Sequence, residues 1–176
     1  MKKTDQQQYL RYEHKEQSLD LLDGDLATVL EYWRSLSSGG RVPAWDEFDL
    51  MELPLHIVPN INVFDAVDGG EDFKCRFWGS THTEIWGREM AGKLLSGIHP
   101  SKSFFQTVLR EMRTTITSKV PRTTTSYLFN KNDIILFQVL LRLPLTDASG
   151  EVVHCLNCVK FESDYEKSKK LLEALR

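Results

Sequence analysis

Residues 134–145, with the sequence IILFQVLLRLPL, decide the class of fold. A run of this length that is apolar at nearly every position is typical of a strand covered on both faces. Turn-forming sequences bound it, with NKND at residues 130–133 and DASG at residues 147–150. The segment is therefore predicted to form a central strand.

The segments beyond these turns are also predicted to form strands. Residues 122–130 (RTTTSYLFN) are rich in Thr and aromatic residues, and residues 151–161 (EVVHCLNCVKF) are mostly apolar. Farther upstream, residues 56–67 (HIVPNINVFDAV) and 73–79 (FKCRFWG) flank the turn DGG at residues 68–70. These two runs are predicted to pair as a hairpin.

Helical patterns separate and flank the two groups of strands. Residues 101–117 carry apolar side chains at helical spacing, and a short helix is expected over residues 80–87. An amphipathic helix over residues 26–37 precedes the first strand, and a charged helix over residues 163–175 follows the last. This order predicts an α+β fold. We expect a five-stranded antiparallel sheet with helices on one face, plus flanking N- and C-terminal helices.

Length and composition favour one domain. The chain has 176 residues, which we divide into a polar arm or loosely held helix (1–22), a domain with its leading helix (23–162) and a terminal helix (163–176). The formal net charge of -3, without a long basic run, argues against nucleic-acid binding. No signal peptide and no membrane-spanning apolar run is evident, and three cysteines fit a reducing compartment. We therefore expect a cytoplasmic protein.

Several short motifs in the first two thirds of the chain resemble the bacterial PAS family 5, a group of small, mostly single-domain proteins. The motifs are EYWRSL at 31–36, GRVP at 40–43, LP at 53–54, CRFWGS at 75–80 and WGREMAGK at 86–93. Ser80 stands where that family usually has Thr. The resemblance covers about residues 26–117 by motif and implies a PAS-like sensory or regulatory domain.

PAS proteins commonly bind ligands between the sheet and its helices, so this is where we expect a small apolar or anionic ligand. The side chains that we expect to contact it are Arg76, Trp78, His82, Trp86, Phe105 and Met112. The alternative is that these side chains simply fill the core. Arg76 would bind an anion if its strand face points inward, or else form an internal ion pair. The sequence identifies no cofactor.

Other kinds of chemistry find little support. Cys155 and Cys158 would point to opposite faces of a strand, so we expect no metal site there. Cys75 lies on a strand and not on the helix where light-sensing LOV domains place their reactive cysteine, which argues against a flavin photocycle. His82 and His99 are the candidates for haem ligation, although His99 is more simply explained as part of a helix cap.

Function is expected to depend on contacts with other proteins. Leu26, Leu30 and Trp33 are predicted to contact a second copy in a homodimer, unless they pack on the chain's own sheet. An unidentified signalling partner is expected as well. A small-molecule carrier is the main alternative, with Arg76 or Asn157 as its polar groups. We predict no enzyme, because His82 and Glu84 lack a third catalytic partner.

Overall fold

The computed structural model describes residues 11–97, 102–130, 133–162 and 164–174. Within these ranges the strands form one six-stranded sheet in the order β1-β4-β5-β6-β2-β3, and every neighbouring pair is antiparallel. The strands are β1 (Arg11–Gln17), β2 (Ile61–Val67), β3 (Asp72–Trp78), β4 (Arg122–Asn130), β5 (Asp133–Thr146) and β6 (Val152–Glu162).

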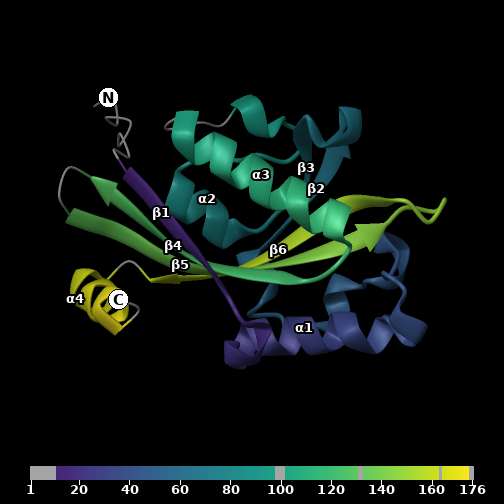
Figure 1. Ribbon diagram of the computed structural model, residues 1–176, viewed down its shortest axis with the longest axis horizontal. Helices are drawn as coiled ribbons and strands as arrows, with labels where there is room; N and C mark the ends of the chain where they lie inside the picture. The colour runs from purple at the N-terminus through teal and green to yellow at the C-terminus, as the bar shows by residue number, and fades with distance from the viewer. Residues whose placement is uncertain (1–10, 98–101, 131–132, 163, 175–176) are drawn as a thin grey trace.

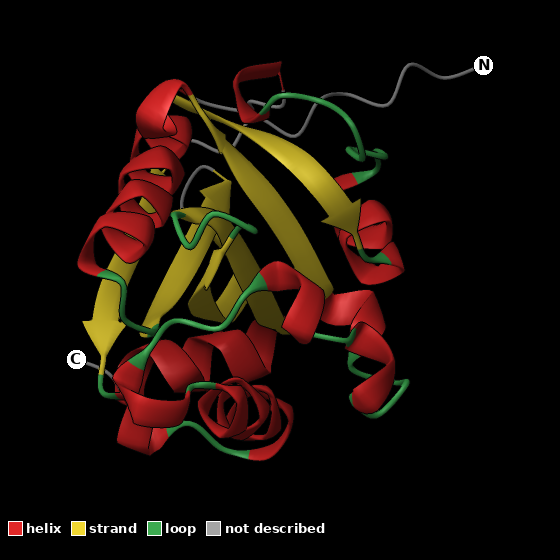
Figure 2. Ribbon diagram, turned by 90° about the vertical axis from the view of Figure 1, so that its right-hand side faces the viewer, coloured by secondary structure: helices red, strands yellow, loops and turns green. Residues whose placement is uncertain are grey.

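Helices cover both faces of the sheet (Figures 1 and 2). They are α1 (Gly24–Leu36), α2 (Ser80–Trp86), α3 (Lys102–Ser118) and α4 (Tyr165–Ala174). We call the face under α2 and α3 the inner face, and the face under α1 the outer face. The expected helices on one face are α2 and α3, while α1, which was predicted as a flanking helix, lies on the opposite side.

The predicted order of elements is confirmed from α1 onward, and most boundaries there agree within two residues; β1 adds a sixth strand to the five that were predicted. The β4 strand has its predicted bounds, and β5 is one residue longer at each end. The β2 strand begins five residues later than expected, at Ile61, because Pro59 lies in a 3-10 turn over Val58–Asn60 and cannot donate to a strand ladder.

The prediction of a polar arm or loosely held helix over residues 1–22 was wrong for residues 11–17, whereas residues 1–10 lie outside the described ranges. Residues 11–17 form β1, which pairs with β4 from Arg11 opposite Phe129 to Gln17 opposite Thr123. Nothing in the polar local sequence signals a strand. Its partner lies more than 100 residues away, and backbone hydrogen bonds to the edge of β4 provide the stabilisation.

One glycine is required by close packing between the hairpin and the chain that enters it. A Cβ atom at Gly79 would collide with the carbonyl oxygens of Pro59 and Ile61. The Gly79 N–H donates to the Ile61 carbonyl oxygen at 2.9 Å, which positions the start of α2. Ser80, Thr81 and His82 therefore follow a fixed corner at the end of β3.

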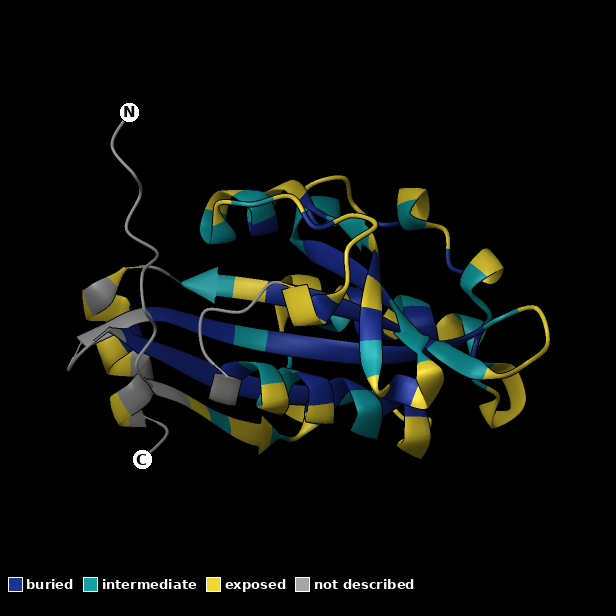
Figure 3. Cartoon of the chain, turned by 90° about the horizontal axis from the view of Figure 1, so that it is seen from above, coloured by how far each residue is buried: buried dark blue, intermediate teal, exposed yellow. Residues whose placement is uncertain are grey.

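The apolar core differs between the two faces. On the outer face, α1 and the connecting segment after it pack on β2, β5 and β6 in one large cluster, and Tyr127, Phe129 and Phe137 form a smaller one on β4 and β5. On the inner face the apolar residues form two clusters, one around Met112 and Phe64 and one around Leu128 and Phe104, and Val108 packs against both. The central strands are almost wholly buried between these layers (Figure 3).

Candidate functional site

A set of buried polar side chains separates the two inner clusters, and we call it the inner polar band. The band comes from four strands and α2, and none of its members is more than 7% exposed. Its members are Thr124 and Ser126 on β4, Gln138 and Arg142 on β5, Asn157 on β6, Asn62 on β2 and His82 on α2. Strand alternation and register place them on one face, with Arg142 opposite Asn157 and Gln138 opposite Ser126.

One end of the band is a hydrogen-bonded chain. Asn157 Nδ2 donates to Asn62 Oδ1 at 2.7 Å, and Asn62 Nδ2 lies 3.4 Å from the ring nitrogens of His82. His82 Nε2 lies 3.2 Å from the carbonyl oxygen of Asn60, which can only accept a hydrogen bond. Nε2 therefore carries the proton, and Nδ1 is left as the acceptor.

The surroundings of His82 keep its ring neutral. Burial lowers the pKa of His82 to about 4, against the opposing effect of the Asn60 carbonyl. The ring packs between Trp78, with centroids 4.9 Å apart, and Phe161, at 5.2 Å. At neutral pH this residue is a fixed, uncharged hydrogen-bonding group within an aromatic setting.

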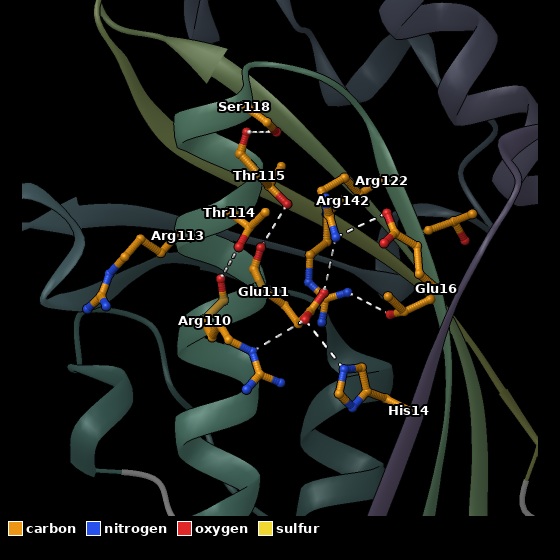
Figure 4. A network of polar contacts seen from close by, with 12 residues as sticks. His14, Glu16, Arg110, Glu111, Arg113, Thr114, Thr115, Ser118, Arg122 and Arg142 are labelled. Atoms are coloured by element: carbon orange, nitrogen blue, oxygen red, sulfur yellow. Dashed lines mark hydrogen bonds and ion pairs between the residues drawn. The ribbon is translucent and has the colours of Figure 1, made fainter.

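The other end of the band is a buried guanidinium. Arg142 is 1% exposed, and its Nη1 donates to Thr124 Oγ1 at 2.8 Å. Close to it in the view of Figure 4, on α3, lies Glu111, the one buried acidic residue in the described ranges. Glu111 interacts with His14 at 3.4 Å and Arg122 at 3.9 Å, so the carboxylate is shared with groups from β1 and β4.

Five of the six predicted ligand contacts lie on the inner side. Met112 is fully buried in the Phe64 cluster, where Trp78 and Phe105 pack beside it. Trp86 packs with Phe104, in the other cluster. His82 is part of the inner polar band. These five side chains therefore all belong to the layer on the inner face that contains the band.

The sixth, Arg76, lies on the other face from Trp78, although residues two apart on a regular strand would share a face. A bulge is the reason, because Val63 pairs with Phe77 while Phe64 pairs with Cys75, so Arg76 has no opposite residue. The extra residue breaks the alternation along β3. Cys75 and Trp78 consequently pack inward, whereas Phe77 packs on the outer cluster.

Arg76 forms the ion pair that was the alternative to ligand binding. Its Nε donates to Asp65 Oδ1 at 2.7 Å, and His154 Nδ1 lies 2.7 Å from the same oxygen. Burial acts to raise the pKa of Asp65, but the hydrogen bonds from His154 and Arg76 outweigh it and hold that pKa below its usual value. Arg76 also lies over the Trp45 ring, 5.8 Å from its centroid.

The three side chains predicted to contact a second copy lie in the chain's own core. Leu26, Leu30 and Trp33 are buried against the outer face of the sheet. Trp33 Nε1 donates to the Pro144 carbonyl oxygen at 2.8 Å, which ties α1 to β5. These residues are at most 6% exposed and leave almost no surface for a partner, so any homodimer would use other residues.

The cysteines are placed as the strand pattern predicts. Cys155 packs in the inner core and Cys158 in the outer core, so the two thiols lie on opposite faces. Burial raises the pKa of Cys75, Cys155 and Cys158 to about 12, which keeps all three protonated. No group of His, Cys, Asp or Glu in the described ranges is arranged to hold a metal. His99 lies outside the described residues.

Sequence reasoning missed most of the inner polar band. Gln138 and Arg142 are the only strongly polar residues in the apolar run of β5, and residues four apart on a strand share a face. That spacing was the available signal. The hydroxyls of Thr124 and Ser126 carried no comparable signal, because Thr and Ser are frequent in strands and at their ends.

Solved structures show what kind of fold this is. The PAS domain of BvgS from Bordetella pertussis superposes with a TM-score of 0.51 at 15% identity, over 74% of this chain and 96% of that one. The dark structure of the blue-light photoreceptor Aureochrome1 LOV gives 0.46 at 14%, over 73% and 92%. No protein-family model and no curated protein matches the sequence. The likeness to the BvgS domain shows that the chain has a PAS-like α+β fold.

No helix in the described ranges has both the length and the apolar character needed to cross a membrane.

Proposed function

We propose that this protein is a sensory or regulatory PAS-like domain of the family-5 type, acting in the bacterial cytoplasm, that binds a small molecule at the inner polar band. The observation that carries the proposal is the division of the inner apolar core by this band. A polar group buried without full hydrogen bonding lowers stability, so a core selected for packing alone would be apolar.

The outer face of the same strands allows a direct comparison with the inner face. There the same strands present Leu141, Leu143 and Leu156 to α1, and all three are fully buried in one apolar cluster. On the inner face the neighbouring positions are Arg142 and Asn157. Convergent polar groups within an otherwise apolar layer are what a small-molecule site requires.

The first test is the mass of the protein as purified, measured under native and denaturing conditions. We expect a non-covalent ligand under native conditions that is lost on denaturation. Asn157→Leu should lower its occupancy, because it removes an amide from the centre of the band. Arg76→Gln on the outer face is the matched control and should retain the ligand. Equal occupancy in the two variants would contradict a site at the band.

A sensor must also transmit what it binds, and we propose that it does so through association, either as a homodimer or with a signalling protein. Three exposed apolar side chains support this part of the proposal. Leu21 is 71% exposed, while Met51 and Leu55 are each 69% exposed. They lie on segments next to α1, where His56, beside Leu55, contacts Asp25 at 3.0 Å.

Sedimentation velocity with and without bound ligand tests the transmission step. We expect the association state to depend on ligand and to weaken in Leu21→Ser and Leu55→Ser. Glu31→Gln, on the exposed side of α1, is the control. A carrier, the alternative function, would bind ligand while its association state stayed constant.

A further inference from the structure

We infer that the ligand of the inner polar band is a small carboxylic acid whose carboxylate is bound by Arg142 between β4, β5 and α3. The inference rests on the proposed ligand-binding function and names the chemistry of that site. The Arg142 guanidinium stays charged at any physiological pH, so its burial removes a full charge from water. Such a group is retained in a core only with a compensating partner.

The described residues do not supply that partner. Arg142 has one hydrogen bond, to the hydroxyl of Thr124, and forms no ion pair in the described part of the chain. Its Nε has no hydrogen-bond partner. A neutral hydroxyl satisfies one of five donors and contributes no negative charge.

The nearby acid is already shared. Glu111 Oε1 interacts with His14 and with Arg110, 3.8 Å away, and Oε2 interacts with Arg122. Arg122 lies directly opposite Arg142 in the ladder between β4 and β5. Two largely buried guanidinium groups thus face one buried carboxylate. Glu16, which also pairs with Arg122 at 3.0 Å, lies on the more exposed strand β1.

The unsatisfied polar atoms point to the same chemistry. Nε of Arg142, Nε of Arg122 and Oγ of Ser126 are buried without a hydrogen-bond partner among the described residues. Each of them can donate. Ser126 lies two residues beyond Thr124 on the same strand face, a separation of roughly 7 Å. A ligand that brings negative charge and several acceptor oxygens would satisfy this arrangement.

A carboxylic acid fits this site better than a more highly charged anion does. A carboxylate matches the planar guanidinium with two parallel hydrogen bonds. Its single charge would balance the charge of Arg142, which pairs with no acid among the described residues. The apolar body would contact the clusters on either side of the band, which include Met112 and Leu128.

Isothermal titration tests the inference with named probes in matched pairs, after any resident ligand has been removed by refolding. Hexanoate is compared with hexanamide, benzoate with benzamide, and inorganic phosphate is titrated alone. We expect an acid to bind at least about tenfold more tightly than its amide, because hydrogen bonds to a charged group are the stronger ones. Arg142→Gln should abolish this preference, whereas Arg76→Gln should preserve it.

Two further variants cover the case in which Arg142→Gln does not fold. Ser126→Ala removes one hydroxyl and should weaken acid binding at least about tenfold, the lower limit for a hydrogen bond to a charged group. Arg122→Gln leaves Arg142 in place and should also lower the preference for acid over amide. Circular dichroism shows whether each variant retains the fold.

The remaining outcomes distinguish an error in the carboxylate inference from an error in the proposed function. Amides that bind as tightly as acids, or phosphate that binds more tightly than both, would refute a carboxylate site while leaving a ligand site at the band. Absence of binding by any probe would also refute it. The proposed function fails separately, if the purified protein carries no ligand and no added molecule changes its stability or association.

Discussion

The two faces of the same sheet are built differently, although they share β2, β5 and β6. On the outer face, α1 covers a continuous apolar cluster, and the charged residues Arg76 and Asp65 are paired at its edge. On the inner face, α2 and α3 cover two apolar clusters divided by polar groups, including Arg142, which forms no ion pair with the described residues. The outer face under α1 buries an apolar cluster, whereas the inner face gives up some of that stability for placed donors and acceptors.

The largest effect is expected on the outer face. Leu143→Ala should lower the free energy of unfolding by about 3 kcal/mol, because it removes buried methyl groups and leaves a cavity under α1. Urea denaturation measures it. Leu21→Ala, at an exposed position, is the control and should change stability by less than about 0.5 kcal/mol. A small loss at Leu143 would mean that this face is less tightly packed than its burial indicates.

The next largest effect is a pH dependence that belongs to the inner face. Burial lowers the pKa of His82 from 6.5 to about 4, so between these values the unfolded chain takes up a proton that the folded chain does not. Stability is therefore complete above pH 6.5 and falls as the pH falls toward 4. The expected loss between pH 7 and pH 5 is about 2 kcal/mol.

Denaturation of the wild type and of His82→Gln across this range measures that contribution. The variant should show a correspondingly flatter dependence, while His56→Gln controls for removal of a histidine at the surface. If the free energy of unfolding depended on pH in the same way in the wild type and in His82→Gln, protonation of His82 would not destabilise the fold. The ring would then not be buried as the structure shows.

A smaller effect distinguishes the hydrogen bonds of the band from its apolar surroundings. Asn157→Leu leaves Asn62 Oδ1 buried without its 2.7 Å donor and should cost about 1 kcal/mol. The double variant Asn62→Leu, Asn157→Leu removes both partners and should recover most of that loss. A double variant that is as unstable as the sum of the singles would indicate that the band serves stability.

The smallest effect is expected at the edge of the outer face. Arg76→Gln breaks an ion pair that is partly open to solvent, with 40% of the arginine side chain exposed. Such pairs contribute little, so the loss should stay below about 1 kcal/mol. Thermal denaturation at low and high salt measures it. A larger loss would show that Asp65 and His154 depend on Arg76 for their arrangement.

Local pattern predicted the elements far better than it predicted the site. The bounds of β4 and the position of α3 followed from residue type and helical spacing within each segment. The direction of Arg76 did not, because one bulged residue reverses every later position on the strand. Leu26 and Trp33 have the same amphipathic pattern whether they face a partner or their own sheet, so only packing could assign them.

The sequence by itself determined that this chain forms an α+β fold with a central, doubly covered β5, because periodicity and turn residues act over a few neighbouring positions. Only the tertiary structure decided that β1 completes the sheet and that Arg142, Asn157 and His82 form one band. These contacts join residues from opposite parts of the chain, and their energies depend on burial and on shared partners. Neither of these can be read from a local stretch of sequence.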